Sequence, residues 1–177
     1  MTGAQPASAE EYATLHGKAL IGYLLKMGVC LDDAQDAANE TLKRMFEHWD
    51  SIEQPKAWAR RTAYNIVIDT VRARQSESDK SARAQAQFVL AATGTDDLWM
   101  LKEGQRAVIG HIRKLPAAQR QVIALYVDGF TNDEIAEMMG SSAATVRSNL
   151  RHAKSRLRAE LEAEGVYRRT TGTDGGE

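Results

Sequence analysis

The sequence is poor in the residue types that stabilise small extracellular folds and metal-bound folds. Its 177 residues include a single cysteine and three prolines, and aromatic side chains make up only 6% of them. One cysteine cannot form an internal disulfide, and it cannot supply the thiolate ligands of the usual structural zinc sites. Cys30 therefore suits a reducing compartment.

Long apolar runs are also missing. The apolar segment ALIGYLL at residues 19–25 is far shorter than the roughly 20 residues that a membrane-spanning helix requires. The first residues, MTGAQPASAEE, are polar and acidic, and they lack the apolar centre of a secretory signal. We therefore expect a soluble protein located in the cytoplasm, with no membrane contact.

Neither sign of charge dominates the chain, whose formal net charge is −1. Hydrophobic residues make up 43% of the sequence and charged residues 27%, which is a globular composition rather than a disordered one. The length has room for one ordinary domain or for two small ones.

The alternating pattern of β-strands is almost absent, whereas apolar residues recur at helical spacing in several stretches. In the first half, this spacing predicts helices over residues 12–27, 32–49 and 55–74. Asp32 or Asp33 is expected near the start of the second helix. In the third helix, Trp58, Thr62, Ile66 and Val67 could face a core.

The composition changes after residue 74. The segment QSESDKSARAQAQ is polar, and TGTDD follows at residues 93–97. So long a segment is unusual inside a compact domain and favours a domain boundary. We predict an all-α protein in which a flexible linker, residues 76–97, joins two small helical domains, residues 8–75 and 98–163, before a disordered tail, residues 164–177. The apolar piece FVLAA inside the linker fits either a helical turn or a docking patch.

The second domain carries clear signals for helix ends. Its helical pattern starts at Leu98, and Gly104 and Gly110 interrupt the first segment. Pro116 is expected to open a helix that Asp128 and Gly129 close. TNDE at residues 131–134 is a capping box, and Gly140 is suited to a left-handed stop. Ser141 or Ser142 would then cap the last helix, which is expected to run to Arg158. A short capped helix, a glycine turn and a longer helix form the pattern of a DNA-binding helix-turn-helix.

The second helix of this motif concentrates positive charge. TVRSNLRHAKSRLR, from Thr145, holds five basic residues and no acid. At helical spacing, an apolar stripe of Val146, Leu150, Ala153 and Leu157 lies beside a basic ridge. Residues at the N-terminal end of such a helix read bases, and those further along bind phosphates. The predicted DNA-contacting residues are Ser142, Thr145, Arg147, Ser148, Arg151, Lys154 and Arg158.

A second basic region, WARRTAYNIVIDTVRAR, starts at Trp58. It mixes Trp58 and Tyr64 with arginines, a combination that suits phosphate contact and base stacking on single strands. The alternative is structural: Trp58 belongs to the core and the arginines form a solvated face. From the residues alone, both interpretations remain open.

The order of these segments resembles bacterial RNA polymerase sigma factors of the small extracytoplasmic-function (ECF) type. The resemblance is carried by DAQDAANETLKRMFEHW, by PKAWARRTAYNIVIDTVRAR and by LPAAQRQVIALYVDGFTNDEIAEMMGSSAATVRSNLRHAKSRLR, in that order. Together they span most of residues 10–162. Members usually have Gln where this chain has Asn39, and a large apolar residue where it has Ala59.

The resemblance implies a transcription initiation factor with two partners, core RNA polymerase and promoter DNA. The second helix, residues 32–49, is rich in acidic residues. It would bind the polymerase through Asp36, Asn39, Glu40 and Arg44. The first domain would open the minus-10 element with Lys56, Arg60, Arg61, Asn65, Arg72 and Arg74, and the helix-turn-helix would read the minus-35 element. Factors of this type are often held by an anti-sigma factor, which would be a further partner.

The sequence has two rival functional interpretations. An autonomous helix-turn-helix regulator would normally dimerise on a two-fold operator, and no obvious dimer helix is left over. A protein-only adaptor is the second rival. We expect no enzyme, because the four histidines are scattered, as is typical of surface or helix-packing positions, and no GxxxxGK[ST], HExxH or GxSxG motif occurs. No cofactor, metal ion or small-molecule substrate is expected.

Overall fold

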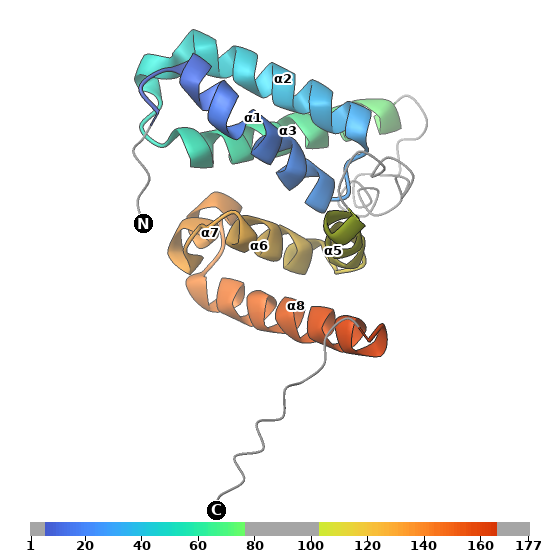
Figure 1. Ribbon diagram of the computed structural model, residues 1–177. Helices are drawn as coiled ribbons and strands as arrows, with labels where there is room; N and C mark the ends of the chain where they lie inside the picture. Colours follow the sequence, from blue (N-terminus) through green and yellow to red (C-terminus); the bar gives the residue numbers. More distant parts are fainter. Residues whose placement is uncertain (1–5, 77–102, 166–177) are drawn as a thin grey trace, which may run out of the picture.

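The computed structural model describes residues 6–76 and 103–165, and all of its regular elements in these ranges are helices. Figure 1 shows two helical units, one made of α1, α2 and α3 and the other of α5, α6, α7 and α8. The described helices are α1 (Ala9–Lys26), α2 (Leu31–His48), a 3₁₀ turn η1 (Trp49–Ser51), α3 (Pro55–Ser76), α5 (Glu103–Arg113), α6 (Ala117–Val127), α7 (Asn132–Met139) and α8 (Ala143–Ala163). The prediction of an all-α fold with a helix-turn-helix in its second part is confirmed. The FVLAA segment and the tail lie outside the described residues.

The helix starts of the first unit differ in detail from the prediction. Helix α1 begins three residues earlier than predicted, because the hydroxyl of Ser8 accepts a hydrogen bond from the Glu11 amide and caps the helix. Helix α2 starts after Cys30, which makes no side-chain capping bond. As predicted, Asp32 and Asp33 lie near its start, in the first turn, where carboxylates interact favourably with the helix dipole.

Helix α3 packs through small residues rather than through the predicted stripe. Of the predicted face, Val67 is buried, whereas Trp58, Thr62 and Ile66 are only partly buried. The fully buried positions are Ala59, Arg60 and Ala63. Alanine lets helix backbones approach closely, so the contact face of α3 is rotated from the one that its larger side chains suggested.

The helix ends of the second unit agree with the sequence signals. Pro116 precedes α6, and Asp128 ends it before Gly129, whose φ of 91° lies in the region that favours glycine. Gly140 closes α7 in the left-handed conformation, with φ 58°. Gly104 and Gly110, which we expected to interrupt the first segment of this unit, both lie inside α5. Helix α5 starts at Glu103, and the expected start at residue 98 lies outside the described residues.

Helix α8 extends five residues beyond its predicted end at residue 158. A tertiary contact secures this extension, because the buried His111 of α5 binds two carboxylates of α8. Its Nδ1 lies 2.8 Å from Glu160 Oε2, and its Nε2 lies 3.1 Å from Glu164 Oε2. His111 is therefore a helix-packing residue, as expected for the scattered histidines.

The capping box of α7 predicts a pH-dependent contribution to stability. The backbone amide of Thr131 donates to the Glu134 carboxylate at 2.7 Å, as does its hydroxyl, and these bonds lower the pKa of Glu134 below its usual value of 4.5. A lowered folded-state pKa means that the stabilisation is complete above about pH 4.5 and is lost as the pH falls through that lower pKa. Replacing Glu134 with Gln should reduce the free energy of unfolding by about 0.5–1 kcal/mol at neutral pH.

Urea unfolding of Glu134→Gln and the wild type at pH 7 and at acidic pH checks this. The difference between the two proteins should shrink in acid, whereas Glu162→Gln, a change at an exposed position of α8, should behave like the wild type at both pH values. A difference for Glu134→Gln that does not change with pH would contradict the carboxylate's role.

The described residues hold neither a membrane-spanning helix nor a cluster of metal-binding side chains. No helix within 6–76 and 103–165 has both the length and the apolarity needed to cross a membrane. Within the same ranges, no three His, Cys, Asp or Glu side chains are grouped so that they could hold a metal ion.

Candidate nucleic-acid interface

Helices α7 and α8 form a helix-turn-helix whose crossing is fixed by apolar contacts. Ile135 of α7 is fully buried, as is Val146 of α8, and the predicted α8 stripe continues through buried Leu150 and Ala153. Leu157 is partly buried against the same core. The opposite side of α8 is consequently exposed along its length.

The first residues of α8 interact with one another. The Ser142 hydroxyl accepts a hydrogen bond from the Thr145 amide at 3.1 Å and lies 2.9 Å from the Thr145 hydroxyl. These bonds cap the helix and fix its first turn. Both side chains are exposed, and so is that of Ser148. Their predicted contact with bases remains a prediction.

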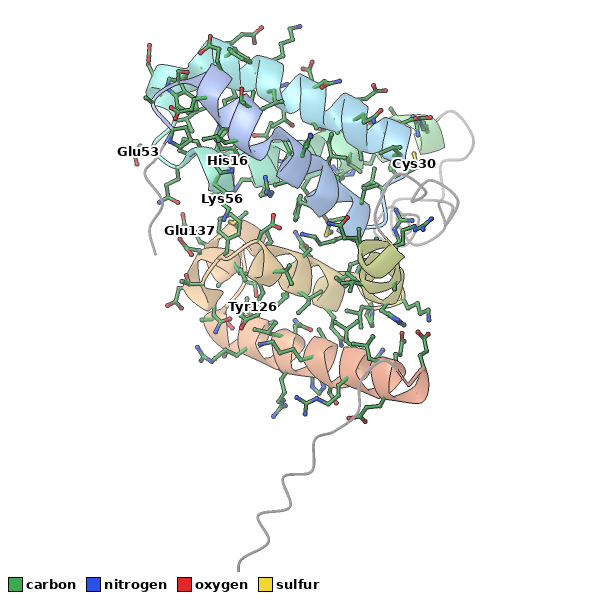
Figure 2. All side chains as sticks on the ribbon, in the orientation of Figure 1. His16, Cys30, Glu53, Lys56, Tyr126 and Glu137 are labelled. Carbon is green, nitrogen blue, oxygen red and sulfur yellow. The ribbon has the colours of Figure 1, made fainter. Side chains whose placement is uncertain are left out.

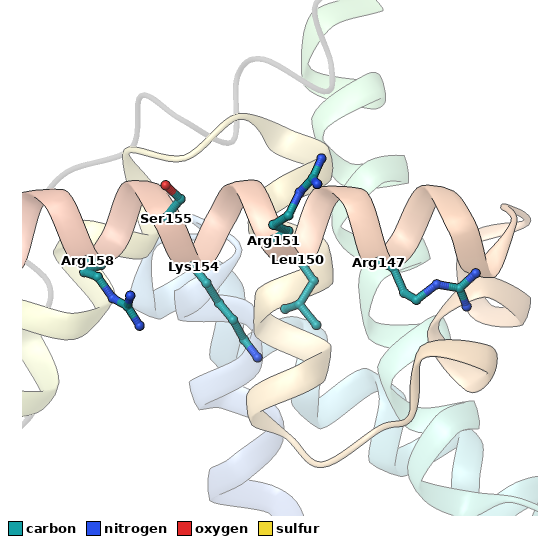
Figure 3. Close-up of a pocket in the computed structure, with 6 residues that line it drawn as sticks. All are labelled: Arg147, Leu150, Arg151, Lys154, Ser155 and Arg158. Carbon is teal, nitrogen blue, oxygen red and sulfur yellow. The ribbon is translucent and has the colours of Figure 1, made fainter.

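The basic ridge of α8 borders a groove of about 450 Å³. Figure 3 shows its lining residues, which are Arg147, Leu150, Arg151, Lys154, Ser155 and Arg158. The Lys154 ammonium lies 3.9 Å from the centre of the Tyr126 ring, so a cation–π contact orients it. Within the described ranges, no salt bridge involves the three arginines. The guanidinium groups of Arg147, Arg151 and Arg158 are therefore exposed and unpaired with any carboxylate of the described residues.

The second predicted DNA-contacting set divides between two sides of α3. At roughly 100° per residue, Arg61, Asn65 and Arg72 share one side. Lys56, Arg60 and Arg74 fall on another, roughly 140° away. The six residues therefore do not form one continuous surface on this helix.

The members of this set also differ in their partners. Arg61 and Asn65 are exposed. Arg72 lies 3.6 Å from Asp69 in a solvent-exposed pair. Arg74 donates two hydrogen bonds of 2.7 Å to Asp33, and this pairing lowers the pKa of the Asp33 carboxyl.

The predicted polymerase-contacting residues share one side of α2. Asp36, Asn39 and Arg44 are exposed, and Glu40 is half-buried. Arg44 donates to Glu40 at 2.8 Å, and this hydrogen bond lowers the pKa of Glu40. The other side of α2 carries the buried residues Ala34, Ala37, Ala38, Thr41 and Met45. The set is thus an accessible polar surface, and its role remains a prediction.

Asp128 is the residue that sequence reasoning missed. Its position before Gly129 indicated only a helix end, yet its carboxylate is 9% exposed and lies between two cations of the first unit, Lys26 at 2.7 Å and Arg60 at 2.6 Å. Arg60, predicted to contact DNA, is itself only 1% exposed. No local sequence signal links residues about 70 to 100 positions apart, so this contact could not be predicted.

Comparison with known families agrees with this architecture. Residues 13–77 match "Sigma-70 region 2", and residues 105–157 match "Sigma-70, region 4". The first match covers α2 and α3 and most of α1, and the second covers the helix-turn-helix.

Curated relatives match over nearly the whole chain. "RNA polymerase sigma-E factor" of Streptomyces coelicolor is 29% identical over 161 residues, which cover 89% of this chain and 88% of that protein. "ECF RNA polymerase sigma factor SigL" of Mycobacterium tuberculosis is 27% identical over 181 residues, which cover 95% of this chain and 98% of that protein.

Two solved structures share the fold. The sigma factor RpoE of Bartonella quintana, in complex with the anti-sigma factor NepR, superposes with a TM-score of 0.68 at 24% identity, over 86% of this chain and 96% of that one. CnrH, in complex with the cytosolic domain of CnrY, gives 0.57 at 23% identity, over 88% of each chain.

The region-2 match lies over the three-helix unit and the region-4 match over the helix-turn-helix with its basic ridge, so the chain belongs to the bacterial sigma-70 family of sigma factors. Within it, the chain is an ECF sigma factor, a transcription initiation factor.

Proposed function

We propose that this chain directs core RNA polymerase to its promoters through a division of labour between its two helical units. The observation that carries the proposal is the open basic ridge of α8, presented by a well-packed helix-turn-helix in the region-4 match. Arg147 and the first turn of α8 would read the minus-35 element. Arg151, Lys154 and Arg158 would bind its phosphates.

The region-2 unit would serve the polymerase and the minus-10 element. Asp36, Asn39, Glu40 and Arg44 would contact the polymerase from the exposed side of α2. The side of α3 that bears Arg61, Asn65 and Arg72 would hold the non-template strand. We assign the domain bounds 8–75 and 98–163 to these two units, with residues 76–97 between them.

The location of the chain, its mode of action and a further partner follow from the same assignment. Transcription places it in the cytoplasm, and its action consists of binding without catalysis or a cofactor. Both related structures were solved with a regulatory partner, the anti-sigma factor NepR in one and the cytosolic domain of CnrY in the other. An anti-sigma factor is therefore proposed as a partner here.

Co-purification with bacterial core polymerase, followed by run-off transcription from a library of promoter fragments, tests the proposal. Stable binding with promoter-selective transcripts is the expected result, and the transcript starts would locate both elements. Failure to bind core, together with tight and salt-sensitive binding to duplex DNA alone, would instead indicate an autonomous regulator.

Reversing one charge on α2 tests the polymerase contact. Asp36→Arg should weaken binding to core polymerase by about tenfold or more, because a like charge in a complementary interface disfavours the complex. Fluorescence anisotropy with labelled chain measures the affinity, and circular dichroism confirms that the variant is folded. Lys18→Glu, a charge reversal of the same size and opposite sign at an exposed position of α1, should bind like the wild type. Equal losses for both variants would contradict a specific role of Asp36.

A further inference from the structure

A small cavity lies where α1 and α3 of the first unit meet α6 and α7 of the second, along the boundary that Lys56 faces in Figure 2. Its volume is about 190 Å³, and its polar lining residues are Tyr23, Arg60, Arg61, Tyr64, Asn65 and Gln121. Pockets for drug-sized ligands have volumes of roughly 300–1,000 Å³, whereas one water molecule occupies roughly 30 Å³. The cavity is therefore suited to a ligand of only a few heavy atoms.

The charge beside this cavity is positive. Arg60 and Arg61 are adjacent cations of α3, and none of the described residues that line the cavity is acidic. The Asp128 carboxylate lies 2.6 Å from Arg60 Nε, but it is shared with the Lys26 ammonium at 2.7 Å. These four groups comprise three cations and one carboxylate, so an excess of positive charge remains among them. Such an excess attracts an anion.

Arg60 also carries a donor without an acceptor. The residue is 1% exposed, and its Nη1 is buried with no hydrogen-bond partner among the described residues. The guanidinium carbon lies 5.5 Å from the centre of the Tyr23 ring, in a cation–π contact. A buried charged donor that lacks an acceptor is destabilising. Because Arg60 lines the cavity, an anion bound there would supply the acceptor.

Neutral donors line the same cavity. Burial raises the pKa of the Tyr23 and Tyr64 hydroxyls above the usual value of 10, so both stay protonated at neutral pH and can donate a hydrogen bond. The side-chain amides of Asn65 on α3 and Gln121 on α6 are donors as well. Guanidinium groups bind phosphate oxygens through charge-assisted hydrogen bonds, and neutral hydroxyl and amide donors can complete such a site.

We propose that this cavity is a binding site for a small phosphate-bearing anion, with Arg60 and Arg61 supplying the charge and Tyr64 a hydroxyl donor. The site goes beyond the proposed function, because neither core polymerase nor promoter DNA takes part in it. Arg61 and Asn65 also belong to the side of α3 proposed for the non-template strand, so the anion and that strand would compete for them. This competition rests on the proposed function, whereas the site itself does not.

Isothermal titration calorimetry of the full chain with sodium pyrophosphate and with inorganic phosphate tests the site. One pyrophosphate per chain should bind with a Kd of about 10–100 μM. Inorganic phosphate, which has fewer oxygens to accept hydrogen bonds, should bind about tenfold more weakly. Sodium chloride at equal ionic strength is the reference for screening of surface charges.

Variants of the lining residues separate this cavity from a general attraction of anions to the chain. Arg61→Gln should weaken pyrophosphate binding by about tenfold, and Tyr64→Phe, which removes only the hydroxyl, by about three- to tenfold. Gln121→Leu should weaken it too, because that amide comes from the second unit. Arg156→Gln is the matched control, since Arg156 is an exposed arginine of α8 that does not line the cavity. It should bind pyrophosphate like the wild type.

Three results would overturn the site: no saturable binding of pyrophosphate by the wild type, an equal loss of binding in Arg156→Gln, or full binding in both Arg61→Gln and Tyr64→Phe. A single-stranded minus-10 oligonucleotide that binds through these residues where pyrophosphate does not would also overturn it, because the cavity would then serve the DNA backbone. If Arg61→Gln proves poorly folded by circular dichroism, Tyr64→Phe decides.

The failure of this site and the failure of the proposed function are distinguishable. Anion binding is measured on the chain without polymerase. The proposed function fails on a separate measurement, the absence of promoter-selective transcripts from the wild-type chain with core polymerase.

Discussion

Replacing Arg147 with alanine is expected to reduce discrimination between the correct and an altered minus-35 element by about 10- to 100-fold, the range for loss of a bidentate contact to a base. Arg147 is exposed near the start of α8 and borders the basic groove. Quantitative binding of the polymerase complex to paired promoter fragments measures the ratio. Affinity for core polymerase should be unchanged, because the proposed polymerase residues lie on α2.

Arg156→Ala provides the matched control for this experiment. Arg156 is an exposed arginine of the same helix and lies roughly 180° around it from Arg147. Its removal should leave the discrimination ratio unchanged. Loss of polymerase binding together with promoter preference in Arg147→Ala would contradict the division of labour.

Replacing Ile135 with alanine is expected to lower the free energy of unfolding by about 2–4 kcal/mol. Ile135 is fully buried at the crossing of α7 and α8, so removing most of its side chain leaves a cavity in a close-packed core. Such a loss is a large fraction of the stability of a small helical unit. Urea unfolding monitored by circular dichroism gives the value, and DNA binding should fall as the unit unfolds.

A graded series separates packing from direct DNA contact. Ile135→Val should lower the stability by about 0.5–1.5 kcal/mol. Val108→Ala, at a position 51% exposed, should change it little. If Ile135→Ala lost promoter binding at undiminished stability, its role would not be packing.

Local signals in the sequence predicted the second unit well. Three helix-end signals are local: the capping box at Thr131, the left-handed Gly140 and the cap at Ser142. Each of them involves hydrogen bonds between residues no more than four positions apart. The hydrogen bonds that define these helix ends are short-range, so they can be read from sequence alone. The exposed ridge beside the Val146 stripe follows from helical periodicity in the same way.

Predictions that depended on distant residues were less accurate. The buried side of α3 was predicted from its large side chains, but Ala59 and Ala63 are among its fully buried positions. The end of α8 was placed too early, because its last turns are held by His111 from another helix. Both errors arise where packing, rather than local preference, decides.

The sequence by itself determined the helical class of this protein, the helix-turn-helix and the side of α8 that carries positive charge, because caps and periodicity act within a few residues. Only the tertiary structure decided which basic residues are available. It left Arg147 and Arg151 open, and it buried Arg60 against Asp128, 68 positions away. A salt bridge between distant helices depends on how their packed faces meet, and no local pattern encodes that meeting.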